Sequence, residues 1–159
     1  TTAPIVLTTR RPFVNNGRPG VAAGSASLLV TWAQGADDLA TTATEIRAVR
    51  VTRPLGRIDV DGRLLLAGTS TIVSSGPVVA FDGTRWLVVW TETAGISHDL
   101  RAVAVEADGS VVDPSPRLLA TNVAAQEPGA ASTGDGKVLV SFVRTDGASS
   151  AIRAVLVTP

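Results

Sequence analysis

The chain has 159 residues, of which 45% are apolar, 18% are charged and only 4% are aromatic. Fourteen basic side chains balance fourteen acidic ones, so the formal net charge is zero, and cysteine is absent. The apolar content excludes intrinsic disorder, and the length suits one domain. Because nucleic acids and anionic membranes usually bind a basic face, we expect neither as a partner. Disulfides and thiolate metal sites are excluded, and we predict no cofactor and no metal.

The first predicted element is a short extended segment, Pro4 to Thr9. Its residues match Pro116 to Thr121 position for position, although the two segments lie at opposite ends of the pattern described below. We therefore assign residues 1–16 as a closing strand and linker, separate from the three units of similar sequence that follow.

The first unit, residues 17–75, is predicted to hold four strands. Pro19 opens it, the apolar run Leu28 to Trp32 is the second strand, Ile46 to Val49 marks the third, and Arg63 to Ala67 is the fourth. The loop from Ala33 to Glu45 is longer than its counterparts in the other units.

The second unit, residues 76–126, shows the same order of strands most clearly. Its expected strands are Pro77 to Phe81, Trp86 to Glu92, Leu100 to Glu106 and Arg117 to Ala120, with an Asp82-Gly83 turn after the first. Asp-Gly suits the positive φ angles of a tight hairpin. The run Trp86 to Trp90 is apolar at every position, which is typical of a strand buried on both faces. We therefore expect this sheet to lie between two neighbours.

The third unit, residues 127–159, repeats the opening proline (Pro128) and the apolar run Val138 to Phe142. The third-strand sequence Ile/Leu-Arg-Ala-Val, present once in each unit, recurs at Ile152 to Val155. The sequence then ends at Pro159 without a fourth strand, and we expect Ile5 to Leu7 to supply it beside Ile152 to Val157. Such closure removes exposed sheet edges.

Four-stranded units arranged in a ring define a β-propeller. We therefore predict an all-β chain of three propeller-type units, which is half of a six-bladed ring. Three blades do not close a propeller, so we expect a homodimer, or a second chain that completes the ring. The alternative is a β-trefoil, which also has three repeats of four strands but closes within one chain. The doubly apolar strand favours the propeller.

The second unit also carries a family resemblance. The pattern from Pro77 to Trp90, followed by Asp99 to Val103 and Ala107 to Pro114, resembles tandem repeats of large secreted bacterial proteins, which are taken to be propeller blades. The first unit departs from the pattern at Gly24 to Ser27, and the third at Thr133 to Gly136. The resemblance implies a propeller fold and a secreted, extracellular location. It implies no reaction, because the repeats share no catalytic motif.

Four residues are weak candidates for ligand binding: Asp37, Asp38, Glu92 and His98. The adjacent aspartates lie in the longest loop, where carboxylates attract cations but are usually only solvated. His98 is the one histidine, and a general base would need a positioned nucleophile beside it. We expect His98 to be an exposed loop residue instead.

Two sets of residues recur at fixed positions of the units: the aromatics Trp32, Trp90 and Phe142, and the arginines Arg47, Arg101 and Arg153. The aromatics are predicted to form the core between units, rather than an exposed platform for sugars. The arginines are predicted to pair with carboxylates or carbonyl groups between adjacent units, rather than to form a ring that binds an anion.

These observations predict a non-catalytic extracellular binding or structural module that recognises a glycan or a protein through its loops. One alternative is a propeller-type glycosidase or lyase, which would use loop carboxylates from Asp37, Asp38, Glu92 or Asp99 as its catalytic pair. A further alternative is an inert segment of a longer repeat protein.

Overall fold

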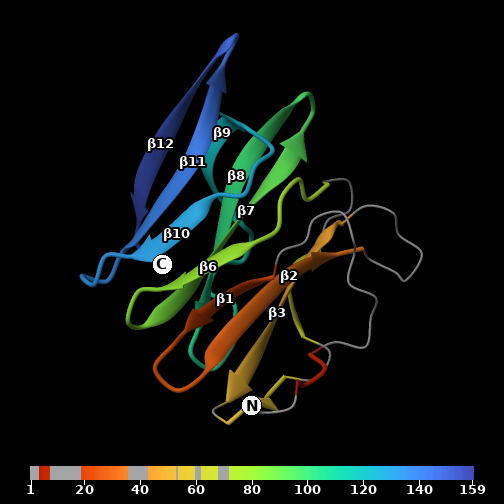
Figure 1. Ribbon diagram of the computed structural model, residues 1–159, viewed down its shortest axis with the longest axis vertical. Helices are drawn as coiled ribbons and strands as arrows, with labels where there is room; N and C mark the ends of the chain where they lie inside the picture. The colour runs from red at the N-terminus through yellow and green to blue at the C-terminus, as the bar shows by residue number, and fades with distance from the viewer. Residues whose placement is uncertain (1–3, 8–18, 36–42, 53, 60–61, 68–71) are drawn as a thin grey trace.

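The computed structural model describes residues 4–7, 19–35, 43–52, 54–59, 62–67 and 72–159. The described part is all-β, with twelve strands and no helix, and its strands form two hydrogen-bonded sheets. It therefore contains no helix long and apolar enough to cross a membrane. Figure 1 shows three groups of strands side by side, with β1–β3 at one end and β10–β12 at the other.

The first unit is an antiparallel sheet in the order β1, β2, β3, β5. Its strands are β1 (Gly20–Ala23), β2 (Leu28–Gln34), β3 (Glu45–Thr52) and β5 (Arg63–Ala67), and the short β4 (Gly56–Arg57) pairs with the far end of β3. The predicted second, third and fourth strands are confirmed, and β5 has the predicted bounds.

The second unit has the order β6, β7, β8, β9. Its strands are β6 (Val78–Phe81), β7 (Arg85–Ala94), β8 (Ser97–Glu106) and β9 (Arg117–Val123). Asp82 forms the predicted turn, since its Oδ1 accepts hydrogen bonds from the backbone N–H groups of Thr84 and Arg85, each at 2.6 Å. Gly83 has a φ of 113°, which explains why glycine follows the aspartate.

The third unit has only three long pairings. Its strands are β10 (Gly129–Ser132), β11 (Val138–Asp146) and β12 (Ser149–Val157), in that order. One residue pair, Arg144 with Val123, joins β11 to β9 and makes a single sheet of the second and third units. Among the described residues β12 pairs with β11 alone.

The sheets of neighbouring units pack face to face. One core cluster combines Leu29, Ile46 and Ala48 of the first unit with Trp86, Val88 and Trp90 of the second. Another combines Leu87, Val89, Leu100 and Ala102 of the second unit with Val138 and Val140 of the third. The five residues from Trp86 to Trp90 are at most 1% exposed. The prediction of a strand buried on both faces is therefore confirmed for β7.

The first strands of the three units lie next to one another, with β6 in contact with both β1 and β10. This approach is close enough to require glycine. A Cβ atom on Gly20 would lie 2.5 Å from the carbonyl oxygen of Pro77 and 2.8 Å from Oγ1 of Thr31. Any side chain at this position would push β1 away from β6.

The expected pairing of the N-terminal segment with β12 is not formed within the chain. Residues 4–7 belong to no strand and lie on the first unit, where Leu7 packs against Trp32 and Val49. Nη1 of Arg57 donates a hydrogen bond of 3.4 Å to the carbonyl oxygen of Leu7. The reason is distance, because β12 lies in the third unit at the opposite end of the molecule (Figure 1). A single chain therefore does not close on itself through this segment.

Candidate functional site

The recurring aromatic and arginine residues face each other across the second and third strands of each unit. Trp32 lies directly opposite Arg47, Trp90 opposite Arg101, and Phe142 opposite Arg153. Directly opposed residues in an antiparallel pair point to the same face of the sheet. The next pairs on the same face are Gln34 with Glu45, Glu92 with Asp99, and Arg144 with Ala151. Each unit thus has four side chains grouped at one end of one face.

In the first unit this group is a chain of buried hydrogen bonds. Nε1 of Trp32 donates to Oε1 of Gln34 at 2.8 Å, and Nε2 of Gln34 donates to Oε2 of Glu45 at 3.2 Å. Nε of Arg47 donates to the same Glu45 oxygen at 2.9 Å. Because each polar group has a partner, the group can be buried without a desolvation penalty left uncompensated.

The second unit uses two carboxylates for the same purpose. Nε1 of Trp90 donates to Oε2 of Glu92 at 3.4 Å, and Nη2 of Arg101 donates to Oδ2 of Asp99 at 3.1 Å. Nε of Arg101 is 2.9 Å from Oε1 of Glu92, as an ion pair that is not aligned as a hydrogen bond. Both carboxylates are buried. Both pair with Arg101 of their own unit. Arg47 and Arg101 therefore pair with carboxylates, as predicted, but the prediction that the pairing joins adjacent units is wrong for both.

The third unit has no carboxylate in its group. Phe142 replaces tryptophan, and Arg144 and Ala151 stand where the second unit has Glu92 and Asp99. Arg153 is exposed, and the described residues give it no acidic partner. The predicted pairing with a carboxylate is therefore not found for this arginine.

The predicted aromatic core between units is found for Trp90 and for the half-buried Phe142, but the prediction is wrong for Trp32, which does not lie between two units of this chain. Trp90 is fully buried between the first and second units, and Phe142 packs against the cluster between the second and third units. Trp32 is also buried, but it lies on the far side of the first unit, beneath Leu7. The two tryptophans are thus not available to stack on a sugar ring.

His98 does not lie in a loop, as we expected, but in β8, opposite Thr93. Its side chain is half-buried, and Nδ1 is 2.9 Å from Oγ of Ser74, which in turn is 3.0 Å from Oγ1 of Thr93. A serine beside a histidine can serve as a nucleophile and base. However, no hydrogen bond reaches Nε2 of the ring from the described residues, so the third group that would orient a catalytic histidine is not found there.

Sequence reasoning did not find Ser74. The contact forms because the segment before Pro77 runs beside the end of β7, where the N–H of Ser74 donates to the carbonyl oxygen of Thr91 at 2.8 Å. The N–H of Thr93 donates to the carbonyl oxygen of Ile72, also at 2.8 Å. A loop serine has no periodic signal that would predict this pairing. We interpret the group as a link between the loop and the sheet.

Asp37 and Asp38 lie outside the described residues, so their predicted ligand role is not tested. In the described part of the chain no group of three or more histidine, cysteine, aspartate or glutamate side chains is placed to hold a metal ion.

Arg50 and Asp59 join β3 to the turn that follows β4. Nη2 of Arg50 is 2.8 Å from Oδ1 of Asp59, and the Arg50 Nε and backbone N–H donate to Oδ2 at 3.1 and 2.9 Å. Burial raises the pKa of Asp59, but the hydrogen bonds from Arg50, with help from Arg63, outweigh it and hold the pKa below its ordinary value of 3.8. Asp59 thus holds this turn on β3 through a specific ion pair with Arg50.

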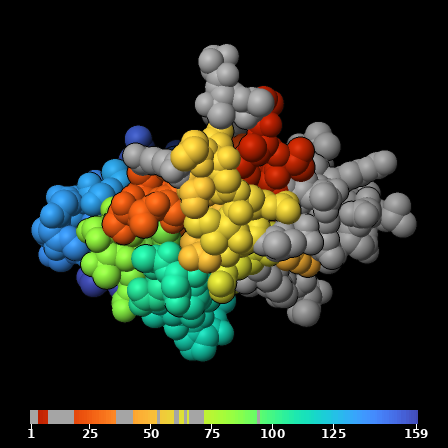
Figure 2. All heavy atoms as spheres, turned by 90° about the horizontal axis from the view of Figure 1, so that it is seen from below, coloured from red at the N-terminus to blue at the C-terminus, as the bar shows by residue number. Residues whose placement is uncertain are grey.

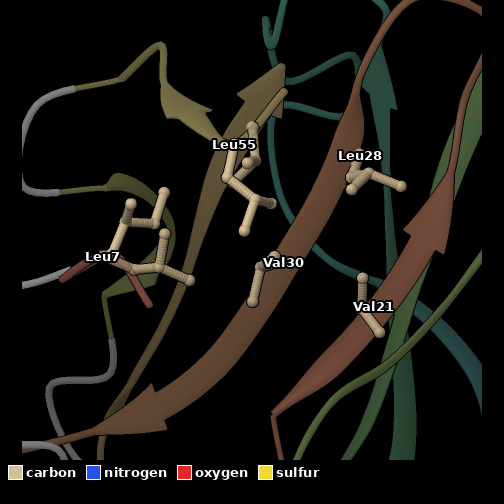
Figure 3. A pocket seen from close by; sticks show the side chains of 7 residues that line it. Leu7, Val21, Leu28, Val30 and Leu55 are labelled. Atoms are coloured by element: carbon tan, nitrogen blue, oxygen red, sulfur yellow. The ribbon is translucent and has the colours of Figure 1, made fainter. Parts of the chain in front are cut away.

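The N-terminal segment and the first unit line an open apolar pocket of about 280 Å³. It is lined by Ile5, Leu7, Val21, Leu28, Val30, Val51 and Leu55. Figure 3 shows Leu7 and Leu55 facing the strands that carry Val30 and Val21, and Figure 2 shows the N-terminal segment in red against the yellow residues of the first unit. Every lining residue is apolar, so the pocket has no polar group to orient a small ligand.

Among the described residues, two sheet faces at the ends of the molecule carry no further unit, although residues 4–7 lie on part of the first face. We call the first the tryptophan face of the first unit (Val21, Leu28, Val30, Trp32 and Val51) and the second the outer face of the third unit (Leu139, Ile152 and Leu156). Val21 lies opposite Val30 as Val79 lies opposite Val88, yet Val21 is 61% exposed and Val79 only 8%. Ile152 is 82% exposed, whereas Leu100 at the corresponding position of β8 is fully buried. Both end faces are therefore apolar surfaces of a kind that the interior units bury.

No protein-family model, curated protein or solved structure matches this chain. The fold and the faces define an all-β protein of stacked antiparallel sheets, and the argument for its function rests on its own geometry.

Proposed function

We propose that the chain is a non-catalytic β-propeller-type module, with a structural or protein-binding role in an extracellular setting. The observation that supports it is the contact between neighbouring units, which occurs twice in one orientation. In both contacts, the sheet face that carries the recurring aromatic residue packs on the preceding unit, against the sheet face that does not carry that unit's aromatic residue. The end face of the first unit and the end face of the third unit could each make a further contact of this kind with another protein.

Two features favour a propeller over a trefoil. The first strands β1, β6 and β10 lie next to one another, as the innermost strands of propeller blades do. The strand β7 is buried on both faces, whereas a strand of a trefoil barrel should alternate between buried and exposed residues. A trefoil also closes within one chain, and this chain has two open end faces.

A protein partner fits the open faces better than a glycan. The tryptophans that would stack on sugar rings are buried, while the two end faces expose large aliphatic side chains. Contiguous exposed aliphatic surface is typical of a protein interaction site. The glycosidase alternative loses support from Glu92 and Asp99, because both carboxylates are occupied by Arg101 and are buried in the sheet.

The test is retention of ligands by the immobilised chain, with Ile152→Asp as the matched variant. We expect protein, and no glycan of an array, to be retained by the wild-type chain and lost from the variant. Because Ile152 is 82% exposed, the variant should fold as the wild-type chain does. A glycan retained equally by both chains would contradict the proposal, as would a wild-type chain that retains neither a second copy of itself nor any other protein.

A further inference from the structure

The fourth strands of the first and second units share an irregularity of register. In β5, Leu64 lies opposite Arg47 and Leu66 opposite Ile46, so Leu65 is an extra residue between them. In β9, Leu118 lies opposite Arg101 and Ala120 opposite Leu100, so Leu119 is the extra residue. An extra residue of this kind forms a β-bulge, which re-aims its side chain.

Both extra leucines pack on the aromatic face of the following unit. Leu65 is buried in the cluster that contains Trp90 and Val103 of the second unit. Leu119 packs against the cluster that contains Val138 and Val140 of the third unit. The fourth strand of each unit therefore reaches across to the next unit through one leucine.

Leu7 makes the equivalent contact on the first unit. It corresponds to Leu119 in the match of Pro4–Thr9 to Pro116–Thr121, and it packs against Trp32, Val49 and Val51. The N-terminal segment thus already lies where the fourth strand of a preceding unit would lie. Among the described residues no unit lies before the first one, and no strand pairs with the outer edge of β12.

The outer face of the third unit is an exposed apolar surface that could cover the tryptophan face of the first unit. Ile152 is 82% exposed, whereas Leu100 and Ile46 at the corresponding positions of β8 and β3 are fully buried against the next unit. Leu139 is 42% exposed, whereas its counterpart Leu87 is fully buried. A unit with an open β12 edge and an open apolar face matches what is missing before the first unit.

We propose that two copies of this chain associate head to tail into a closed ring of six units. The outer face of the third unit of each copy lies on the tryptophan face of the first unit of the other, and residues 4–7 of one copy pair with β12 of the other. The register follows from β9 and β8, where Arg117 lies opposite Ala102 and Leu118 opposite Arg101. It places Ile5 opposite Ala154, and Val6 opposite Arg153.

A second copy is the occupant because one chain supplies both halves of the missing interface. A head-to-tail contact between identical chains forms a ring when its rotation closes. The ring of two copies has two equivalent interfaces, and each one buries the outer face of a third unit and the tryptophan face of a first unit. Each interface also covers the edge of a β12 strand, which would otherwise invite aggregation. This inference rests on the proposed function, since it names the protein partner of the same faces.

The experiment uses disulfide formation, because the natural chain has no cysteine. Directly opposed residues of an antiparallel pair bring two cysteines within the roughly 7 Å between Cα atoms that a disulfide tolerates. The variant Val6→Cys/Arg153→Cys, oxidised at micromolar concentration, should give a covalent dimer at twice the monomer mass of 16.3 kDa. It should give no covalent oligomer larger than the dimer. Two disulfides close the ring, so no free cysteine should remain.

The matched control is Val6→Cys/Thr158→Cys. Thr158 is exposed and follows β12, and it lies five residues from Arg153, or roughly 17 Å along an extended chain. It should not form the dimer. A monomer from the Val6/Arg153 variant, a ladder of longer species, or equal cross-linking of the control would overturn the proposal.

The two proposals fail separately. If the wild-type chain retains a different protein through Ile152 while the cysteine pair gives no dimer, the binding role stands and the ring of two copies is overturned. Circular dichroism and a melting curve of each cysteine variant, expected to match those of the wild-type chain, establish that a negative result does not come from misfolding.

Discussion

Trp90 lies directly opposite Arg101 in the pairing of β7 with β8, and Glu92 contacts both side chains. The Glu92 carboxylate accepts a hydrogen bond from the Trp90 indole N–H and forms an ion pair with the Arg101 guanidinium. Glu92, which the sequence suggests as a ligand or catalytic group, thus stabilises the buried core through these two contacts. This relationship sets the first prediction.

Glu92→Ala should destabilise the chain strongly. The variant leaves the Trp90 N–H without its acceptor and Arg101 with Asp99 alone, so we expect a loss of about 3–5 kcal/mol, as for a broken buried ion pair. Urea unfolding at pH 7 measures it. The control is Glu106→Ala, whose pair with Arg85 has both side chains about one-third exposed and should cost less than about 1 kcal/mol. Equal losses in the two variants would contradict the structural role of Glu92.

Asp59 should make the stability depend on pH. Its pKa in the folded chain is lowered, so its contribution is fully present above the ordinary value of 3.8 and is lost as the pH falls through the lower folded value. Asp59→Asn should therefore lose about 1–3 kcal/mol at pH 7, the range for a hydrogen bond to a charged group. The difference between variant and wild type should shrink below pH 3.8. A difference that is constant from pH 7 to pH 2.5, measured by urea unfolding, would show that the ion pair with Arg50 is not its cause.

Gly20→Ala should separate the first two units. The added Cβ atom would lie 2.5 Å from the carbonyl oxygen of Pro77, which belongs to the backbone and has little freedom to move. We expect a loss of about 1–3 kcal/mol, the usual cost of overpacking, and a lower melting temperature. Ala23→Ser, at an exposed position of the same strand, should stay within about 0.5 kcal/mol of the wild type. An unchanged melting temperature in Gly20→Ala would mean that β1 and β6 are not in close contact.

Leu7→Ala should weaken association more than it weakens the fold. Leu7 packs on the tryptophan face at the edge of the molecule and is half-buried, so its truncation should cost the monomer little. In the proposed ring the same side chain belongs to a fully covered interface, where truncation of a buried leucine costs about 2–5 kcal/mol. Sedimentation over a concentration series should show weaker self-association with a similar melting temperature. Self-association equal to that of the wild type would contradict the assigned place of Leu7.

The strands could be predicted from the sequence because their signals are local. The apolar run at Trp86 to Trp90, the Asp82-Gly83 turn and the fourth strand at Arg63 to Ala67 each follow from residues near to one another in the chain. The burial of Trp90 follows from the apolar run in which it lies and from the recurrence of an aromatic residue at this position. These elements depend on hydrophobic pattern and turn chemistry, which the sequence shows directly.

The candidate site could be predicted only in part because its contacts are not local. His98 was expected in a loop, but the hairpin of β7 and β8 extends to Ala94 and Ser97 and carries the histidine into the sheet. Its contact with Ser74 depends on the course of a loop. The carboxylates of Glu45 and Asp99 lie two residues before Arg47 and Arg101 on the same strand and therefore on the same face. This spacing is visible in the sequence, whereas the contact of Glu92 with Arg101 depends on the register of β7 with β8. The position of Leu7 on the first unit likewise requires the three-dimensional structure.

The mass of the wild-type chain in solution, determined by light scattering beside the Ile152→Asp variant, tests the central claim most directly. The account predicts twice the monomer mass of 16.3 kDa for the wild-type chain and the monomer mass for the variant. A wild-type chain that stays monomeric at concentrations of about 100 μM, or a variant that remains a dimer, would contradict it.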